Sequence, residues 1–134
     1  MARIVDIEGI GDVYAGKLKG AGVTTVEALL DKGANPQGRE ALEQATGVSG
    51  KLILEWVNHA DLFRIKGVAS EYSDLLEEGG VDTVVELAKR NAEHLFAKLQ
   101  EVNAEKKLVR RLPTQSQVTN WIEQAKALPR VITY

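Results

Sequence analysis

Apolar residues recur every three or four positions through most of this 134-residue chain. That spacing places them on one face of an α-helix. After Ser49, for example, Leu52, Ile53, Trp56 and Val57 all fall on the same face. No stretch shows the sustained alternation of apolar and polar residues that a half-buried strand needs. The pattern therefore predicts an all-α fold.

Capping residues and glycines predict where the helices begin and end. In the first half of the chain the expected starts are Asp12, Thr24 or Thr25, Pro36 and Ser49, and the expected stops are Gly22, Gly33 and Gly47. In the second half the expected starts are Ser70, Thr83, Asn91, Asn103 and Thr114, and Pro129 follows the end of the last helix at Leu128. The chain is thus expected to consist of short helices.

The two halves of the chain resemble each other. Residues Ile7–Leu30 align without gaps with Ile65–Ala88 at an offset of 58, and nine of the 24 positions are identical. Trp56–Ala60 also aligns with Trp121–Ala125, but at an offset of 65. A duplication explains both matches. The second copy would then carry seven additional residues, which we place around Lys107–Pro113.

We accordingly predict two units, residues 1–62 and residues 63–134, the second with the seven-residue insertion and a short C-terminal tail. Each unit is expected to contain four to five short helices, and the two units are expected to pack as one globule.

An apolar residue between two glycines, Gly9-Ile10-Gly11, precedes the first predicted helix and is typical of a helix-hairpin-helix turn. In such a turn Ile10 would fill the groove between two helices, while the glycines allow a tight turn and close approach of a partner. The free amides of the next helix would point outward, where the helix dipole favours a phosphate. Lys17 and Lys19 on that helix would anchor a nucleic-acid backbone without reading its sequence.

Two resemblances accompany these motifs. Gly9–Leu18 and Ala21–Leu29 resemble the N-terminal helix-hairpin-helix domains of archaeal and eukaryotic recombinases, and Ala45–Ser49 resembles the second hairpin of such domains. Nearly the whole chain resembles an uncharacterised family that is described only as a domain of unknown function. The matching segments include Leu62–Val68, Val109–Pro113 and Trp121–Lys126. The first resemblance implies tandem SAM-domain-like helical units, and the second implies a fold family but no activity.

Negative charge lies close to both hairpins. Glu8 and Asp12 flank the first hairpin, and in the second unit Ala69 replaces Gly11. The helix after the second hairpin carries four acidic residues, Glu71, Asp74, Glu77 and Glu78. We therefore expect the second hairpin to be structural. For the first, two interpretations stay open: a non-catalytic module that contacts the backbone of DNA or RNA, or a protein–protein interaction module with purely structural hairpins.

The net charge of −2 is unevenly distributed. Residues 1–63 and residues 64–97 each carry a balance of −3, whereas residues 98–134 carry +4. Four basic residues of this last region have the spacing of one helix side: Lys106, Lys107, Arg110 and Arg111. They would hold an anionic partner, or alternatively form a solvated face whose charge is offset by Glu101 and Glu105.

Other chemistry finds little support in the sequence. Without cysteine there is no disulfide or thiol nucleophile, and His59 and His94 lack ligand-like spacing, so we expect no metal and no cofactor. No catalytic motif is present, and we expect neither an enzyme nor a small-molecule substrate.

The aromatic residues match between the two halves. Trp56 and Trp121 are expected in the core, and Tyr14 and Tyr72 are expected to pack with a hydrated hydroxyl. No apolar run reaches the length of a membrane helix, and the first residues lack a signal-peptide core. A cytoplasmic location without membrane contact is expected.

Overall fold

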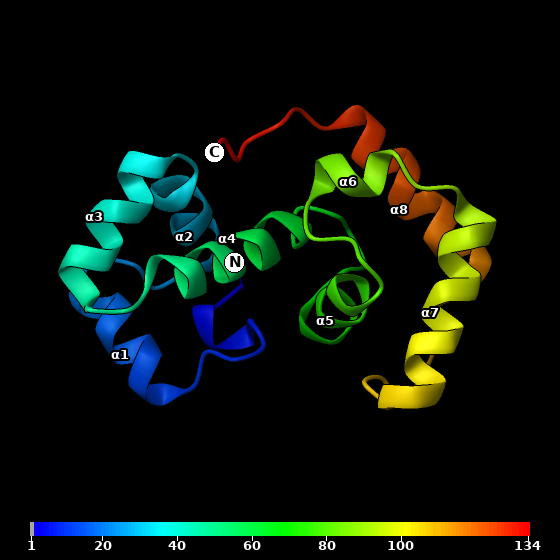
Figure 1. The fold of residues 1–134 in the computed structure, drawn as a ribbon, viewed down its shortest axis with the longest axis horizontal. Coiled ribbons are helices and arrows are strands. Elements are labelled where there is room, and N and C mark those ends of the chain that lie inside the picture. The colour runs from blue at the N-terminus through cyan, green and yellow to red at the C-terminus, as the bar shows by residue number, and fades with distance from the viewer. Residues whose placement is uncertain (1) are drawn as a thin grey trace. The chain divides into compact units, whose positions relative to one another are not determined.

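The computed structural model of the protein describes residues 2–134 (Figure 1). These residues form eight α-helices and a short 3-10 helix, and no strand occurs among them, although an isolated bridge joins Arg3 to Thr25. The all-α prediction is therefore confirmed. In chain order the elements are η1 (Ile4–Asp6), α1 (Asp12–Gly20), α2 (Val26–Gly33), α3 (Pro36–Thr46), α4 (Gly50–Leu62), α5 (Ser70–Glu78), α6 (Val84–Ala88), α7 (Ala92–Lys106) and α8 (Gln115–Ala127). Within residues 2–134, no helix has both the length and the apolar composition required to cross a membrane.

The chain divides into two compact units. The described residues up to Asp61, together with Val131–Tyr134, form unit 1, which contains η1, α1, α2, α3 and nearly all of α4. Leu62–Arg130 form unit 2, which contains α5 to α8. The last four residues of the chain thus belong to unit 1, although they follow unit 2 in the sequence.

In unit 1, α4 contributes the largest buried side chain, that of Trp56. Ile53 and Val57 face inward beside it, as the helical spacing predicts, while Leu18 of α1 and Leu29 of α2 are also fully buried. α3 packs against α1 and α2, and η1 packs against the same two helices. Burial of this apolar surface stabilises the unit.

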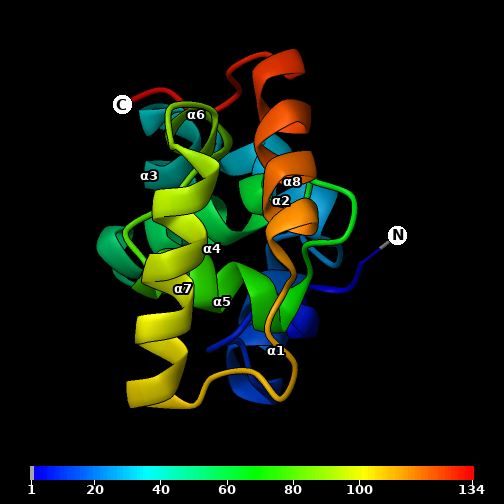
Figure 2. The same ribbon diagram turned by 90° about the vertical axis from the view of Figure 1, so that its right-hand side faces the viewer.

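In unit 2, α8 packs against α6 and α7, and α5 packs against α7. Figure 2 shows α7 and α8 running side by side. Each of the four helices supplies a side chain to one buried apolar cluster, among them Leu76, Leu87, Leu95 and Trp121. The prediction that both tryptophans lie in the core is confirmed, because each is 2% exposed.

α1 and α5 end in the same way. After α1, the amide of Gly22 donates to the carbonyl of Lys19 (2.9 Å) and the amide of Val23 donates to that of Leu18 (2.9 Å). The corresponding bonds after α5 run from Gly80 to Glu77 (3.0 Å) and from Val81 to Leu76 (2.8 Å). These two bonds define a Schellman motif, in which the residue after the C-cap is left-handed. Gly22 and Gly80, with φ of +84° and +92°, adopt that conformation without strain.

A cation also reaches the C-terminal end of each of these helices. Nζ of Lys32 lies 3.3 Å from the carbonyl oxygen of Ala21, and Nη1 of Arg90 lies 3.3 Å from that of Gly79. Lys32 and Arg90 are separated by the same 58 positions as the aligned segments. A positive charge at this end interacts favourably with the helix dipole.

Most of the expected helix starts are confirmed. Side chains cap α2, α3, α4, α6, α7 and α8; the capping residues are Thr25, Asn35, Ser49, Thr83, Asn91 and Thr114. Two starts lie one residue earlier than expected, because Gly11 and Ala69 are the N-caps, and Asp12 and Ser70 are the first helical residues. Asn103 does not begin a helix at all; it lies near the end of α7.

The two units differ in length at several places. α7 has 15 residues whereas α3 has 11, and both helices end in a left-handed C-cap, Lys107 and Gly47. Between that C-cap and the next N-cap lies one residue in unit 1, before Ser49, and six in unit 2, before Thr114. The segment around Lys107–Pro113 is therefore one of two places where the second unit is longer.

Buried Arg39 ties the C-terminal residues to unit 1. Its guanidinium donates to the carbonyls of Gly33 (2.9 Å) and Thr133 (2.7 Å). The amide of Thr133 donates in turn to the carbonyl of Ala34 (2.8 Å), and Ile132 is buried. A charged donor satisfied by two carbonyls makes a stronger contact than a neutral pair.

Two helical glycines allow a matched test of the packing. A Cβ at Gly38 of α3 would lie 1.9 Å from the backbone oxygen of Lys32, whereas a Cβ at Gly16 of α1 would meet nothing within 4 Å. We expect Gly38→Ala to destabilise the protein by about 2 kcal/mol, because the backbone must shift. Gly16→Ala should stabilise it by about 0.5 kcal/mol through helix propensity. Denaturant unfolding of both variants measures these changes, and equal effects would contradict the packing described.

Candidate nucleic-acid interface

The first predicted hairpin is the turn Gly9-Ile10-Gly11 between η1 and α1. Ile10 is 3% exposed and donates its amide to the carbonyl of Ile7 (3.1 Å), whereas Gly9 and Gly11 are exposed on either side of it. Gly9 has a φ of +92°, which only glycine adopts without strain. The hairpin therefore buries its apolar residue and presents its glycine backbone to solvent.

The start of α1 carries no side-chain cap. Gly11 is the N-cap and has no side chain with which to accept a hydrogen bond, and no other side chain caps this start within residues 2–134. The first amides of an α-helix have no partner inside the helix, so those of Asp12, Val13 and Tyr14 are available to an external acceptor. Asp12 was expected to be the cap itself; instead it occupies the first turn.

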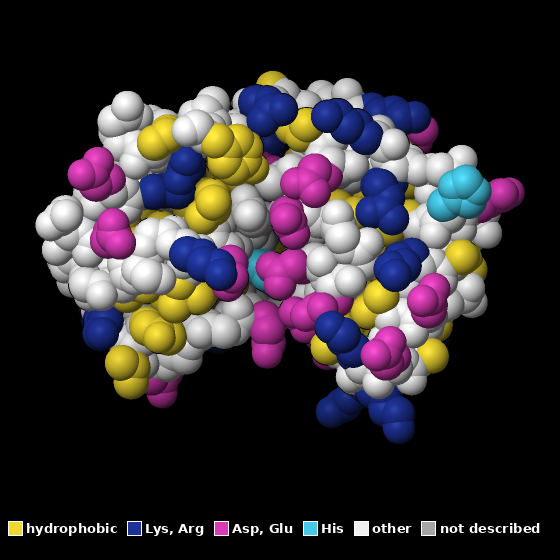
Figure 3. Space-filling model, in the orientation of Figure 1, with side chains coloured by type: hydrophobic (Ala, Val, Ile, Leu, Met, Phe, Trp, Pro, Cys, Tyr) yellow, Lys and Arg dark blue, Asp and Glu magenta, His cyan; other side chains and the backbone are white. Residues whose placement is uncertain are grey.

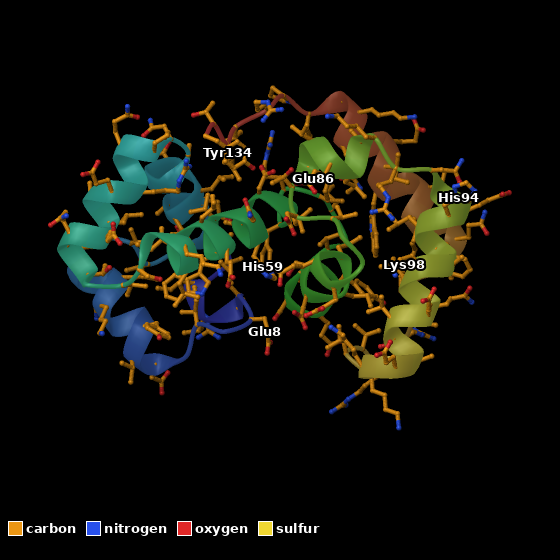
Figure 4. All side chains as sticks on the ribbon, in the orientation of Figure 1. Glu8, His59, Glu86, His94, Lys98 and Tyr134 are labelled. Atoms are coloured by element: carbon orange, nitrogen blue, oxygen red, sulfur yellow. The ribbon has the colours of Figure 1, made fainter. Side chains whose placement is uncertain are left out.

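Charged groups of both signs surround this helix start. Glu8, labelled in Figure 4, lies exposed on the loop after η1, and Asp12 is exposed in the first turn. Nζ of Lys17 lies 5.9 Å from the centre of the Tyr14 ring, so its side chain extends back towards the beginning of α1. The carboxylates oppose an anion at this position, and Lys17 favours one.

Lys19 lies on another side of the helix. Residues two apart on a helix do not face each other, and Lys19 lines a shallow pocket of about 270 Å³ in unit 1. The other residues of this pocket are Arg3, Ile4, Val5, Ala15, Gly16 and Thr24. Of the two lysines predicted to assist the hairpin, Lys17 extends towards the beginning of α1, whereas Lys19 lines this pocket.

The start of α4, after the second hairpin of unit 1, is already occupied. A carboxylate oxygen of Glu43 accepts from the amide of Gly50 (2.8 Å), and Oγ of Ser49 accepts from the amide of Leu52 (3.2 Å). Val48, which lies between the left-handed Gly47 and Ser49 in the sequence, is buried. A carboxylate of the protein thus takes the position at which an external anion would bind.

The start of α5 is uncapped like that of α1, but this helix is acidic along its length. The N-cap is Ala69, and the helix carries Glu71 in its first turn. Further along α5, towards its C-terminal end, carboxylate oxygens of Asp74, Glu77 and Glu78 lie within 4.8 Å of one another. Such a group repels a phosphate.

The basic residues near the end of α7 do not share one helix side. α7 ends at Lys106, and Lys107 adopts the left-handed conformation with φ of +52°, so Arg110 and Arg111 lie beyond the helix. The prediction that all four line one helix face is wrong. Figure 3 shows several Lys and Arg side chains projecting at this end of unit 2.

Asn103 is the physical reason for this early end. Its Oδ1 accepts from the amide of Val109 (2.9 Å) and its Nδ2 donates to the carbonyl of the same residue (3.2 Å). Val109 is buried, which draws the chain back onto unit 2. The helix cannot continue while Asn103 holds the backbone six residues ahead of it.

Lys106 is paired within unit 2. Its ammonium donates a hydrogen bond to a carboxylate oxygen of Glu78. This hydrogen bond and the charge of Glu78 raise the pKa of Lys106 above its ordinary value. The contribution of the pair to stability is present at neutral pH and is lost as the pH rises through that raised pKa. The positive charge of Lys106 is thus compensated by the carboxylate of Glu78.

The aromatic residues form one pair in each unit. The rings of Tyr14 and Trp56 are 5.0 Å apart in an edge-to-face arrangement, and those of Tyr72 and Trp121 are 5.2 Å apart. The hydroxyl of Tyr72 donates to the carbonyl of Arg111 (3.0 Å). The tyrosines therefore pack against the core, as their matching positions predict.

Sequence reasoning missed three features of the site. The cap that Glu43 provides is not visible, because the carboxylate lies seven residues before the amide that it accepts from. Val13, in the first turn of α1, is an apolar residue yet 73% exposed. The third feature is the position of the Trp56 indole nitrogen next to Gly9 of the hairpin.

The two histidines lie in different units, and Figure 4 shows His94 directed away from α7.

The fold and this site define an all-helical protein with a glycine-containing turn before an uncapped helix. The family described as "Domain of unknown function (DUF4332)" matches residues 8–128, and the chain belongs to it. The resemblance to such a family is confirmed. No curated protein and no solved structure matches the chain significantly.

The role of Asn103 can be tested by substitution. Because Asn103→Ala removes both bonds to Val109, we expect a loss of about 1–2 kcal/mol in the free energy of unfolding. Asn120→Ala is the matched control; among the described residues its exposed side chain bonds only to Gln124, and we expect a change below about 0.5 kcal/mol. Equal losses in urea unfolding would show that the Asn103 contact does not fix the segment.

Proposed function

We propose that this protein is a non-catalytic binding module whose first hairpin contacts a phosphate of a nucleic-acid backbone without reading the base sequence. The observation that carries the proposal is the uncapped start of α1 behind the exposed glycines Gly9 and Gly11. The first-turn amides and the helix dipole favour an anion there. Lys17 adds a positive charge on the same helix.

The comparison among helix starts supports this assignment. The start of α4 is filled by Glu43, and α5 carries Glu71 in its first turn and three further acidic residues along its length. The remaining helices longer than one turn are capped by their own side chains. The start of α1 is therefore the position best suited to a phosphate.

A tandem origin for the two units is part of this proposal. The Schellman motifs at Gly22 and Gly80, the carbonyl contacts of Lys32 and Arg90, and the two Tyr–Trp pairs all support it. We assign helix-hairpin-helix character to both units, consistent with the resemblance of the first to recombinase N-terminal domains. In this assignment the second unit has kept the shared helix end, carbonyl contact and Tyr–Trp pair, and its role is structural.

Binding is expected to be weak and sensitive to salt. If about two phosphates are neutralised, raising the salt from about 50 mM to about 200 mM should weaken binding about tenfold. The measurement is fluorescence anisotropy with a labelled mixed-sequence duplex DNA. Absence of binding at the lower salt would exclude the nucleic-acid role.

A charge reversal at Lys17 should weaken this binding by about tenfold, because it replaces a favourable contact by a repulsive one. Lys98→Glu is the matched control. Lys98 is exposed on α7 of unit 2 and is labelled in Figure 4. It undergoes the same change in charge, and we expect it to leave binding within about twofold of the unaltered protein. Equal weakening by both variants would indicate a non-specific charge effect.

Gly11→Asp tests the helix start directly. Gly11 has an extended backbone (φ −89°), and a Cβ there meets nothing within 4 Å, so an aspartate fits. Its carboxylate would cap the free amides and raise the free energy of unfolding by about 0.3 kcal/mol. The same carboxylate would exclude an external anion. We expect DNA binding to be lost and the melting temperature to be kept. Ala69→Asp, the same change at the start of α5, should leave DNA binding unaltered; the opposite pattern would move the site to unit 2.

Binding of a protein partner is the second candidate function. The observation that favours it is Val13, which exposes 73% of its surface at the beginning of α1. Figure 3 shows hydrophobic side chains at the surface near this end of α1. If the protein does not bind DNA at low salt but Val13→Asp abolishes association with a protein partner, this function replaces the first.

A further inference from the structure

The indole of Trp56 lies directly beneath the first hairpin. Trp56 belongs to α4 and is 2% exposed, and its Nε1 is 3.8 Å from the position that a Cβ of Gly9 would take. Gly9 carries no side chain and adopts a left-handed φ of +92°. The indole nitrogen therefore faces the backbone of the turn that precedes α1.

This N–H group has no hydrogen-bond partner among the described residues. An indole nitrogen is a donor only, and a buried one usually finds an acceptor. Some side-chain nitrogen and oxygen atoms of residues 2–134 are fully enclosed by the protein. Among these, Oδ1 of Asn58 is the one that has no hydrogen-bond partner. Nε1 of Trp56 also lacks a partner but is not fully enclosed, so it retains some contact with solvent, and Gly9 lies next to it.

The orientation of the indole is fixed before any ligand binds. Tyr14 packs edge-to-face against it with ring centres 5.0 Å apart, and the neighbouring Ile53 and Val57 on α4 are fully buried. A donor held in place in this way loses little conformational freedom on binding. An acceptor that arrives at the hairpin thus meets a prearranged N–H group.

We propose that the indole N–H of Trp56 donates a hydrogen bond to the anion held at the Gly9–Gly11 hairpin, beside the first amides of α1. This inference rests on the proposed function and specifies the ligand chemistry of the same site. Gly9 and Gly11 are two residues apart, a span of at most about 7 Å. A phosphodiester has two non-bridging oxygens, so one can accept from the indole and the other from the α1 amides. The site accordingly fits a tetrahedral oxyanion with two free oxygens.

Unit 2 supplies a matched control within the same chain. Nε1 of Trp121 lies 3.1 Å from the position of a Cβ on Gly67, and it too has no hydrogen-bond partner in the described chain. The helix behind that hairpin is acidic, with Glu71 in its first turn. The geometry of the indole is therefore repeated where the electrostatics oppose an anion.

The test is an NMR titration of the full-length ¹⁵N-labelled chain. The protein has two tryptophans and hence two indole N–H signals, which Trp56→Phe and Trp121→Phe assign. Inorganic phosphate and duplex DNA are added separately at low salt. We expect both to shift the Trp56 signal downfield, because its N–H gains an acceptor, and to leave the Trp121 signal in place.

Affinity provides a second readout. Trp56→Phe keeps an aromatic ring in the core but removes the donor, and we expect DNA binding to weaken about threefold to tenfold. Trp121→Phe should bind as tightly as the unaltered protein. Thermal melting identifies a variant that no longer folds, and in that case the titration of the unaltered chain decides the question.

The outcomes separate the two proposals. If DNA binds in a salt-sensitive manner while the Trp56 signal stays in place and Trp56→Phe binds normally, the inference on Trp56 is overturned and the proposed function stands. If inorganic phosphate shifts the Trp56 signal but DNA does not bind, the donor is supported and the nucleic-acid role is excluded. If neither ligand shifts the signal and DNA does not bind, both are overturned.

Discussion

The absence of a side chain at Gly9 and Gly67 is the constraint on which the rest of this structure depends. In each unit the turn passes over the indole of a buried tryptophan, and the indole nitrogen approaches within 3.8 Å of the position of a Cβ at Gly9 and within 3.1 Å of that at Gly67. Both glycines are also left-handed, with φ of +92° and +98°. Any other residue would be strained in conformation, and at Gly67 it would also press on the ring. The turn, the tryptophan and the tyrosine against it are consequently fixed together.

The two units share this arrangement of turn, tryptophan and tyrosine, and they differ in the charged residues around it. α1 begins without a cap and carries Lys17, whereas α5 begins without a cap and carries a cluster of carboxylates, one of which holds Lys106. Buried positions such as Leu18 and Leu76 are the same in both. Core residues determine that each unit folds, because close packing tolerates few changes. Exposed residues are free of that requirement, and the charge of each unit is set by them.

Local signals in the sequence were sufficient for most of the fold. Side-chain caps and left-handed glycines act within four residues, so the starts at Thr25 and Asn91 and the stop at Gly47 follow from the sequence. Contacts over longer distances were not predictable in this way. Helical spacing alone extended a basic face to Arg111, because the bonds that end α7 join Asn103 to a residue six positions ahead. For the same reason the turn at Gly9–Gly11 could be located from the sequence, but the cap from Glu43 and the position of the Trp56 indole could not.

The path of the C-terminal residues bears on how the protein is made. Unit 2 is one continuous stretch, Leu62–Arg130, whereas unit 1 includes Val131–Tyr134. These residues emerge from the ribosome after all of unit 2, yet Arg39 of unit 1 takes one of its two acceptors from Thr133. Domains generally fold as units during synthesis, starting from the N-terminus. Here the unit that is translated first acquires its last contacts only after the other unit has been translated.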